Sequence, residues 1–240
     1  MHKSIAAAVV AASAAIAGCG QVHAENGPTV SRSYNVGDFQ KIEVAGPYEV
    51  EVRTGAKAGV SARGSQKLLE RTVVEVDGDK LVIHPEQQKG WLHFGSTRGK
   101  AHFTVTVPQL RGATIAGSGG IQVDQVRGDT FEGTIAGSGD LKLGSTDVQW
   151  LKLTIAGSGA AKAGAGKVQN AEYEIAGSGG VDGGGVVAQQ LKVSIAGSGN
   201  VKGQATGTAD VSIMGSGDVE VTGGAKCSVS KAGSGNVRCS

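Results

Sequence analysis

Apolar and polar residues alternate along most of the second half of the chain. In LKLTI at 151–155 and LKVSI at 191–195, every second side chain is apolar. A period of two places successive side chains on opposite faces of a β-strand, whereas a helix has a period near 3.6. The pattern therefore predicts strands with one face in a core.

The alternating segments recur at a fixed interval. IAGSG or a close variant begins at residues 115, 135, 155, 175, 195, 213 and 231, so the spacing is 20 residues and then 18. Units of this length cannot bury a face alone, and they stack into a solenoid. The expected fold is all-β: a single-stranded parallel β-helix with coils of 18–20 residues.

The GSG triplet follows an inward-facing isoleucine and precedes a new strand, which predicts a corner. Glycine tolerates the positive φ that a tight corner needs. A phosphate-binding loop is not indicated, because GxxxxGK[ST] is absent and no helix follows. The first three predicted corners are Gly117, Ser118 and Gly119; Gly137, Ser138 and Gly139; and Gly157, Ser158 and Gly159.

Two columns of polar residues accompany the corners. Three residues before each isoleucine, the charge alternates in sign. Neighbours in register would lie about 4.8 Å apart, so the pattern indicates that these charges fix the register between coils. Directly after the last corners come Asn200, Asp218 and Asn236, for which a weak cation site and local hydrogen bonding are both open. The alternating column consists of Glu132, Lys152, Glu172, Lys192 and Asp210.

Residues 36–110 contain strands but no pentapeptide. VAG at 44–46 stands where a coil would have IAG, and SQKLLERT from Ser65 predicts a short helix at the open end. GWLHF at 90–94 is either an end cap or an exposed anchor for a partner. We expect one domain over 36–240, with irregular coils and a cap over 36–110 and regular repeats over 111–240.

The N-terminus resembles an export signal. Residues 1–18 combine one lysine with a short apolar stretch, and IAGC at 16–19 resembles a lipobox, which predicts lipidation of Cys19. Cleavage after Ala24 is the alternative. Residues 19–35 are expected to form a flexible tether. Cys227 and Cys239 then remain, both on inward columns of the last coil, either as a disulfide or as two buried thiols.

Composition narrows the choice of partners. Glycine accounts for 41 of 240 residues, and the 23 basic and 21 acidic residues are interspersed with a net charge of +2. Neither nucleic acid nor an anionic membrane surface is favoured. His84, His93 and His102 are expected on the surface rather than at a metal, since no cysteine is near. No metal and no cofactor are expected.

Three segments resemble the head GIN domain family of auto-transporter adhesins: FQKIEVAGPYEVEVRTG, GDKLVIHP and TVTVPQLRGATIAGSGGIQV. The resemblance covers about Asn35 to Ser240. It implies an exported bacterial protein, in many members a lipoprotein, with a right-handed parallel β-helix. The family's biochemical function is unknown, so the resemblance brings no catalytic residues.

The expected function is a non-enzymatic scaffold or adhesion module of the cell envelope, anchored by lipid, with an unknown envelope protein or glycan as partner. The expected location is the outer membrane, the periplasm or the cell surface. The alternative is a β-helix protein that binds or degrades polysaccharide. Asp124, Asp140 and Asp182 fall in different columns, and the aromatic residues form no sugar platform, which disfavours an enzyme.

Overall fold

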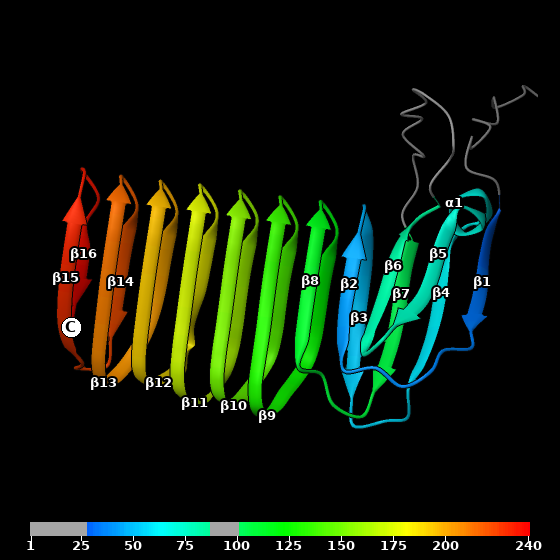
Figure 1. Cartoon of the computed structure of the whole chain (residues 1–240), viewed down its shortest axis with the longest axis horizontal. Coiled ribbons are helices and arrows are strands. Elements are labelled where there is room, and N and C mark those ends of the chain that lie inside the picture. The colour runs from blue at the N-terminus through cyan, green and yellow to red at the C-terminus, as the bar shows by residue number, and fades with distance from the viewer. Residues whose placement is uncertain (1–27, 87–100) are drawn as a thin grey trace, which may run out of the picture.

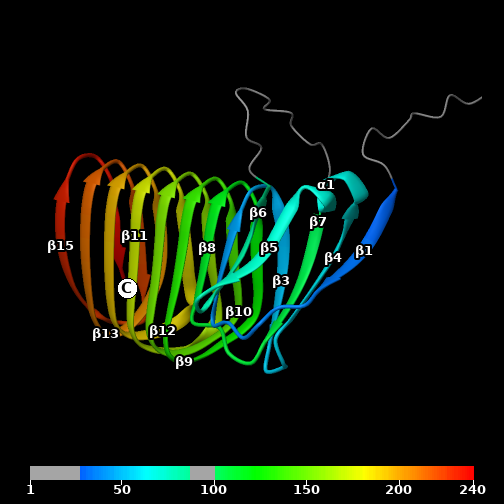
Figure 2. The same cartoon turned by 45° about the vertical axis from the view of Figure 1, so that its right-hand side comes forward.

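The computed structural model describes residues 28–86 and 101–240, in which one 16-stranded sheet winds around a single core. Figure 1 shows the successive coils side by side along the long axis, and Figure 2 shows them obliquely. The predicted all-β solenoid is confirmed. The elements are β1 (Thr29–Tyr34), β2 (Lys41–Ala45), β3 (Tyr48–Thr54), β4 (Gly59–Ser65), α1 (Gln66–Glu70), β5 (Thr72–Asp77), β6 (Lys80–Pro85), β7 (Ala101–Val107), β8 (Gly112–Gly117), β9 (Gly120–Gly137), β10 (Asp140–Gly157), β11 (Ala160–Gly177), β12 (Gly180–Gly197), β13 (Asn200–Gly215), β14 (Asp218–Thr222), β15 (Lys226–Ala232) and β16 (Val237–Cys239).

The coils from β9 to β13 stack in parallel and in sequence order. Leu141 of β10 lies between Ile121 of β9 and Ala161 of β11, an offset of 20 residues on each side. Between β12 and β13 the offset is 20 at Val181 and Val201, and it falls to 18 by the pair Ile195 and Ile213, after register shifts between them. Each column of the repeat is therefore a row of stacked neighbours, as the spacing predicts.

The GSG triplets form the corners between coils. Gly157 has φ 134°, and a Cβ added there would collide with the carbonyl oxygen of Gly137 on the coil before. The N–H of Ser158 donates to the same carbonyl at 2.9 Å. Gly159 has an ordinary φ, but a Cβ there would strike Ile135. The first glycine is thus required by the backbone and the second by close packing.

Inward columns fill the interior of the coils. Every isoleucine of the pentapeptides from Ile115 to Ile213 is at most 3% exposed. Large and small residues face one another across this interior: Tyr173 is 1% exposed, and its ring occupies the space where a side chain of Gly183 would lie. Burial raises the pKa of the Tyr173 hydroxyl. The core is therefore narrow and closely packed.

The N-terminal half contains coils whose order in space differs from their order in the chain. β2 and β3 together form a coil, which lies between β8–β9 on one side and β6–β7 on the other. Val44 stacks on Ile115, and Gly46 has φ 127°. The proposed replacement of IAG by VAG at 44–46 is confirmed.

The N-terminal half is irregular, as expected, but beyond β6 and β7 its strands pair antiparallel and do not form coils. β4 pairs antiparallel with β7, β1 with β4, and β5 with β6. The predicted helix is α1, whose Leu68 and Leu69 join the core. Within this layer β5 and β6 are joined by a short reversal at Gly78 and Asp79, which needs no corner of the GSG type.

The predicted tether over 19–35 is too long. Thr29–Tyr34 form β1, because Val30 and Tyr34 alternate with polar residues and pack against the core. Cys19, Ala24, His93 and the GWLHF segment lie outside the described residues.

Candidate functional site along the axial groove

Three open hollows lie end to end across the coils, over the strand segments that follow the corners. Their volumes are about 90, 440 and 370 Å³. The first two share Asp140 and Lys142, and the last two share Asn200 and Lys202. We call this feature the axial groove. It follows two columns, the first residue after each corner (from Gly120 to Asn236) and the residue two positions later (from Gln122 to Arg238).

Small residues make the middle of the axial groove hollow. Ala160 and Gly180 occupy the first column between Asp140 and Asn200. Gly180 has no left-handed φ, and a Cβ there would lie 3.6 Å from its nearest neighbour, the carbonyl oxygen of Asn200. Neither the backbone nor close packing requires a glycine at this position. Its effect is to leave room on the surface.

The second column lines the groove with charges of both signs. Lys142, Lys162, Asp182 and Lys202 follow one another in this order along the column. Lys162 Nζ lies 3.0 Å from Asp182 Oδ2. The hydrogen bond from Lys162 lowers the pKa of Asp182. Because stacked coils are about 4.8 Å apart, the groove presents donors and acceptors at one-coil intervals. Such a row suits an extended polar ligand.

In the column of Asn200, Asp218 and Asn236, side-chain oxygen atoms accept hydrogen bonds from backbone N–H groups just after the corners. Asn200 Oδ1 accepts the N–H of Asp218 at 3.3 Å, and Asp218 Oδ1 accepts the N–H of Asn236 at 2.9 Å. Of the two alternatives, the observed contacts are local hydrogen bonds. Within residues 28–86 and 101–240, no group of three or more His, Cys, Asp or Glu could hold a metal ion.

The column of alternating charge is in register, but its contacts centre on Glu172. Glu172 lies 2.7 Å from Lys192 and 3.4 Å from Lys152, and Lys152 also lies 3.0 Å from Glu174. Among the described residues, no ion pair joins Glu132 to Lys152. The hydrogen bond from Lys192 and the charge of Lys152 lower the pKa of Glu172. Lys152 leans toward the two glutamates of the next coil and away from Glu132.

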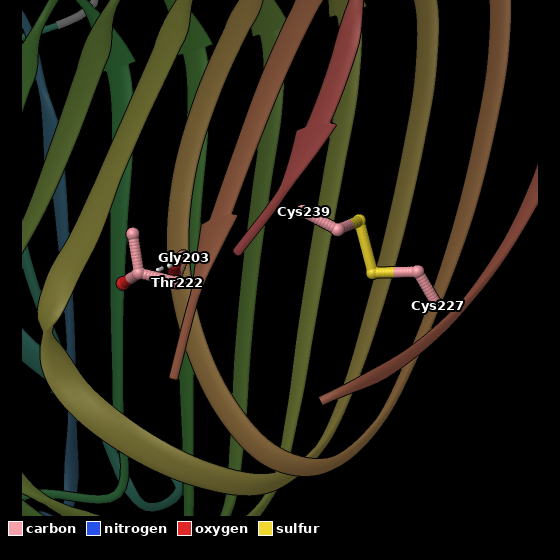
Figure 3. Close-up of a disulfide and its surroundings, with 4 residues drawn as sticks. All are labelled: Gly203, Thr222, Cys227 and Cys239. Carbon is pink, nitrogen blue, oxygen red and sulfur yellow. Dashed lines mark hydrogen bonds between the residues drawn. A yellow bond between two sulfur atoms is a disulfide. The ribbon is translucent and has the colours of Figure 1, made fainter. Parts of the chain in front are cut away.

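The last coil is closed by a disulfide between Cys227 and Cys239. Figure 3 shows the bond crossing from β15 to β16. The disulfide expected between these inward columns is confirmed, and Cys227 packs against the core. Cys227 is half-buried and Cys239 is exposed. β15 and β16 are the last strands of the described residues. In the isoleucine column, Lys231 stacks on Ile213, and its ammonium donates to the carbonyl of Gly235 at 2.7 Å.

The remaining candidate residues are divided between structural and surface roles. Asp124 accepts hydrogen bonds from the N–H and Oγ1 of Thr54 at 3.1 Å. Asp140 and Asp182, predicted to be scattered, both line the axial groove, because their columns are adjacent. His84 lies 3.4 Å from Glu75, and His102 is exposed. The sequence offered one indication of the groove, the small residues Ala160 and Gly180 in an outward column.

Comparison with known families decides the relationship. The family model described as "putative auto-transporter adhesin, head GIN domain" matches residues 38–225. The chain belongs to this family. The match begins before β2 and ends after β14, so it includes most of the described coils, and the family is adhesin-like. No curated protein matches the chain.

Solved structures share the fold of this head GIN domain. "A putative adhesin" from Bacteroides fragilis has a TM-score of 0.77 and 23% identity, covering 88% of this chain and 97% of that one. A "putative lipid binding protein" from Parabacteroides distasonis has a TM-score of 0.72 and 24% identity, covering 90% and 98%. "Putative adhesin" from the same species has a TM-score of 0.70 and 21% identity, covering 89% and 98%. In the part of the chain that the structure describes, no helix is long and apolar enough to cross a membrane.

Proposed function

We propose that the protein is a non-enzymatic adhesion module of the cell envelope that holds an extended glycan along the axial groove. The observation that carries the proposal is the continuity of the groove across the coils, with ammonium, carboxylate and amide groups at one-coil intervals. Lysine donates to sugar hydroxyl oxygens, while aspartate and asparagine accept from sugar hydroxyl groups. A linear glycan offers both kinds of group in a row.

The rigid backbone supports this role. The columns that line the groove belong to strands paired on both sides from β9 to β13, so the spacing of the polar groups is set before a ligand arrives. A preorganised site loses less entropy on binding than a mobile one. An open groove also admits a polymer from the side, without threading an end.

A filled groove tests the proposal. Replacing Gly180 with Gln should place a side chain in the hollow without backbone strain, and should weaken binding of an envelope polysaccharide at least about tenfold. Isothermal titration calorimetry on a panel of acidic, neutral and amino-containing polysaccharides measures this loss. Unchanged binding in Gly180→Gln with an unchanged melting temperature would place the ligand elsewhere.

Two lysines of β11 provide a matched pair. Lys162 lines the groove, whereas Lys167 is exposed on the next stretch of the same coil. Lys162→Ala should reduce polysaccharide affinity, and Lys167→Ala should leave it unchanged. Equal losses would indicate general charge attraction in place of a site.

The same panel separates binding from catalysis. A binding module leaves the polysaccharide intact, so no new reducing ends should form during prolonged incubation. Release of reducing ends by the wild-type protein, abolished by Asp140→Asn or Asp182→Asn, would establish the polysaccharide-degrading alternative.

Attachment to the membrane is part of the proposal and rests on the IAGC motif. Lipid on Cys19 would carry the module on an envelope membrane and leave the coils exposed. Mass spectrometry of the mature N-terminus measures this directly. A lipidated Cys19 is the expected result, and a free Glu25 terminus would instead indicate a soluble exported protein.

A further inference from the structure

The C-terminal end of the sheet is a strand edge that pairs with nothing else in the described chain. β15 pairs with β13 on one side only, and it is the last strand of its row in Figure 1. An edge of this kind presents free N–H and C=O groups to any other extended chain. The sequence of β15 would suit symmetric pairing with a second copy of this protein at every position but one.

The fit follows from the near-symmetry of β15 about Val229. In KCSVSKA, an antiparallel pair of two copies centred on Val229 would place Val229 opposite Val229 and Ser228 opposite Ser230. Val229 is 49% exposed at the open end, so this pairing would bury it. Two-fold symmetric contacts of this type are the commonest in protein assemblies.

Lys231 is the residue that does not fit. It stacks on Ile213 in the inward column, and in the symmetric pair it would lie opposite Cys227 of the second copy, at the core side of the sheet. Residues 223–240 contain Lys226, Lys231 and Arg238 but no aspartate or glutamate. The buried ammonium would therefore meet no carboxylate, and burial of an unpaired charge opposes association.

We infer that Lys231 closes the β15 edge to a second copy of the chain. The ammonium is held at the corner carbonyl of Gly235, where it keeps its contact with water and with the backbone. An inward-pointing charge on an edge strand is a known means of preventing edge-to-edge pairing. The disulfide holds the same coil in place, so the edge persists as an ordered strand.

Two lysine substitutions on one strand test the inference. Lys231→Ile restores the residue that occupies this column in the earlier corners, and should produce a protein whose mass doubles as concentration rises. Lys226→Ile removes the same charge and adds the same side chain, but on the outward column, opposite Thr208. It should remain at the monomer mass, as should the wild-type protein. Light scattering coupled to size-exclusion chromatography measures all three masses.

The fold is checked on the same samples by circular dichroism. If Lys231→Ile lost the β-sheet signal, Lys231→Met would replace it in the mass measurement, because the Met side chain is unbranched like that of lysine. A monomeric, fully folded variant at every concentration would overturn the inference. A dimeric wild-type protein, or equal association of Lys226→Ile, would overturn it as well, because the position of Lys231 would then not matter.

Discussion

The coils from β9 to β13 and the N-terminal layer, which we define as residues 28–86 and 101–110, belong to one continuous sheet but are specified in different ways. In the coils, a residue's neighbours in space lie 20 or 18 positions away in sequence. In the N-terminal layer, β2 and β3 lie between strands that come after them in the chain. The comparison shows that a repeat can determine stacking locally, whereas an irregular end depends on long-range packing.

The two regions also differ in what fills the core. In the N-terminal layer, Phe103 packs edge-on against Tyr48 at 5.5 Å between ring centroids, and lies 6.4 Å from Tyr34. In the coils, the core contains a column of stacked isoleucines, and the corners that follow them require glycine. The layer should therefore be sensitive to the loss of single large side chains, and the coils to any side chain at a corner.

The largest effect is expected at Phe103. Phe103→Ala removes a ring that is 1% exposed and that contacts both tyrosines, so the free energy of unfolding should fall by about 3–5 kcal/mol. Ile155→Val, in the middle of the coils, should cost about 0.5–1.5 kcal/mol because the neighbouring coils keep the column filled. Urea unfolding followed by circular dichroism measures both. Equal losses would mean that the aromatic cluster has no special role in the layer.

A glycine pair tests the other half of the comparison. Gly157→Ala imposes a Cβ at φ 134° against the backbone of the preceding coil, and should cost about 3 kcal/mol. Gly180→Ala is the same substitution at a site where space is open. Its free energy of unfolding should stay within about 0.5 kcal/mol of the wild-type value. If Gly180→Ala were as destabilising as Gly157→Ala, the groove glycine would be structural.

Prediction from sequence succeeded where local pattern and stacking agree. Alternation and spacing located the coils, the corners and the register of the charged column, because each depends only on the repeat. The alternation in β1 is too short to predict a strand, and its antiparallel partner β4 lies some 30 residues later in the chain. The axial groove is not predictable from the charge of its columns, because the hollow arises where the residues of an outward column are small.

The smallest of these effects concerns Glu172, whose position in the coils depends on register. Glu172→Gln removes the contacts with Lys152 and Lys192, and should lower the free energy of unfolding by about 1 kcal/mol at neutral pH. Glu132→Gln is the matched control, because Glu132 is exposed in the same column and makes no ion pair among the described residues. Its effect should be less than half as large.

The dependence on pH identifies the origin of the Glu172 effect. Its pKa is lowered in the folded protein, first by the hydrogen bond from Lys192, so the folded state holds the carboxylate charged at lower pH than the unfolded state does. The stabilisation is therefore complete above the usual glutamate pKa of about 4.3, and is lost as the pH falls through the lower folded value. Urea titrations between neutral pH and about pH 3 should show the wild-type protein converging on Glu172→Gln. A gap between them that stays constant across this range would assign the effect to side-chain packing in place of charge.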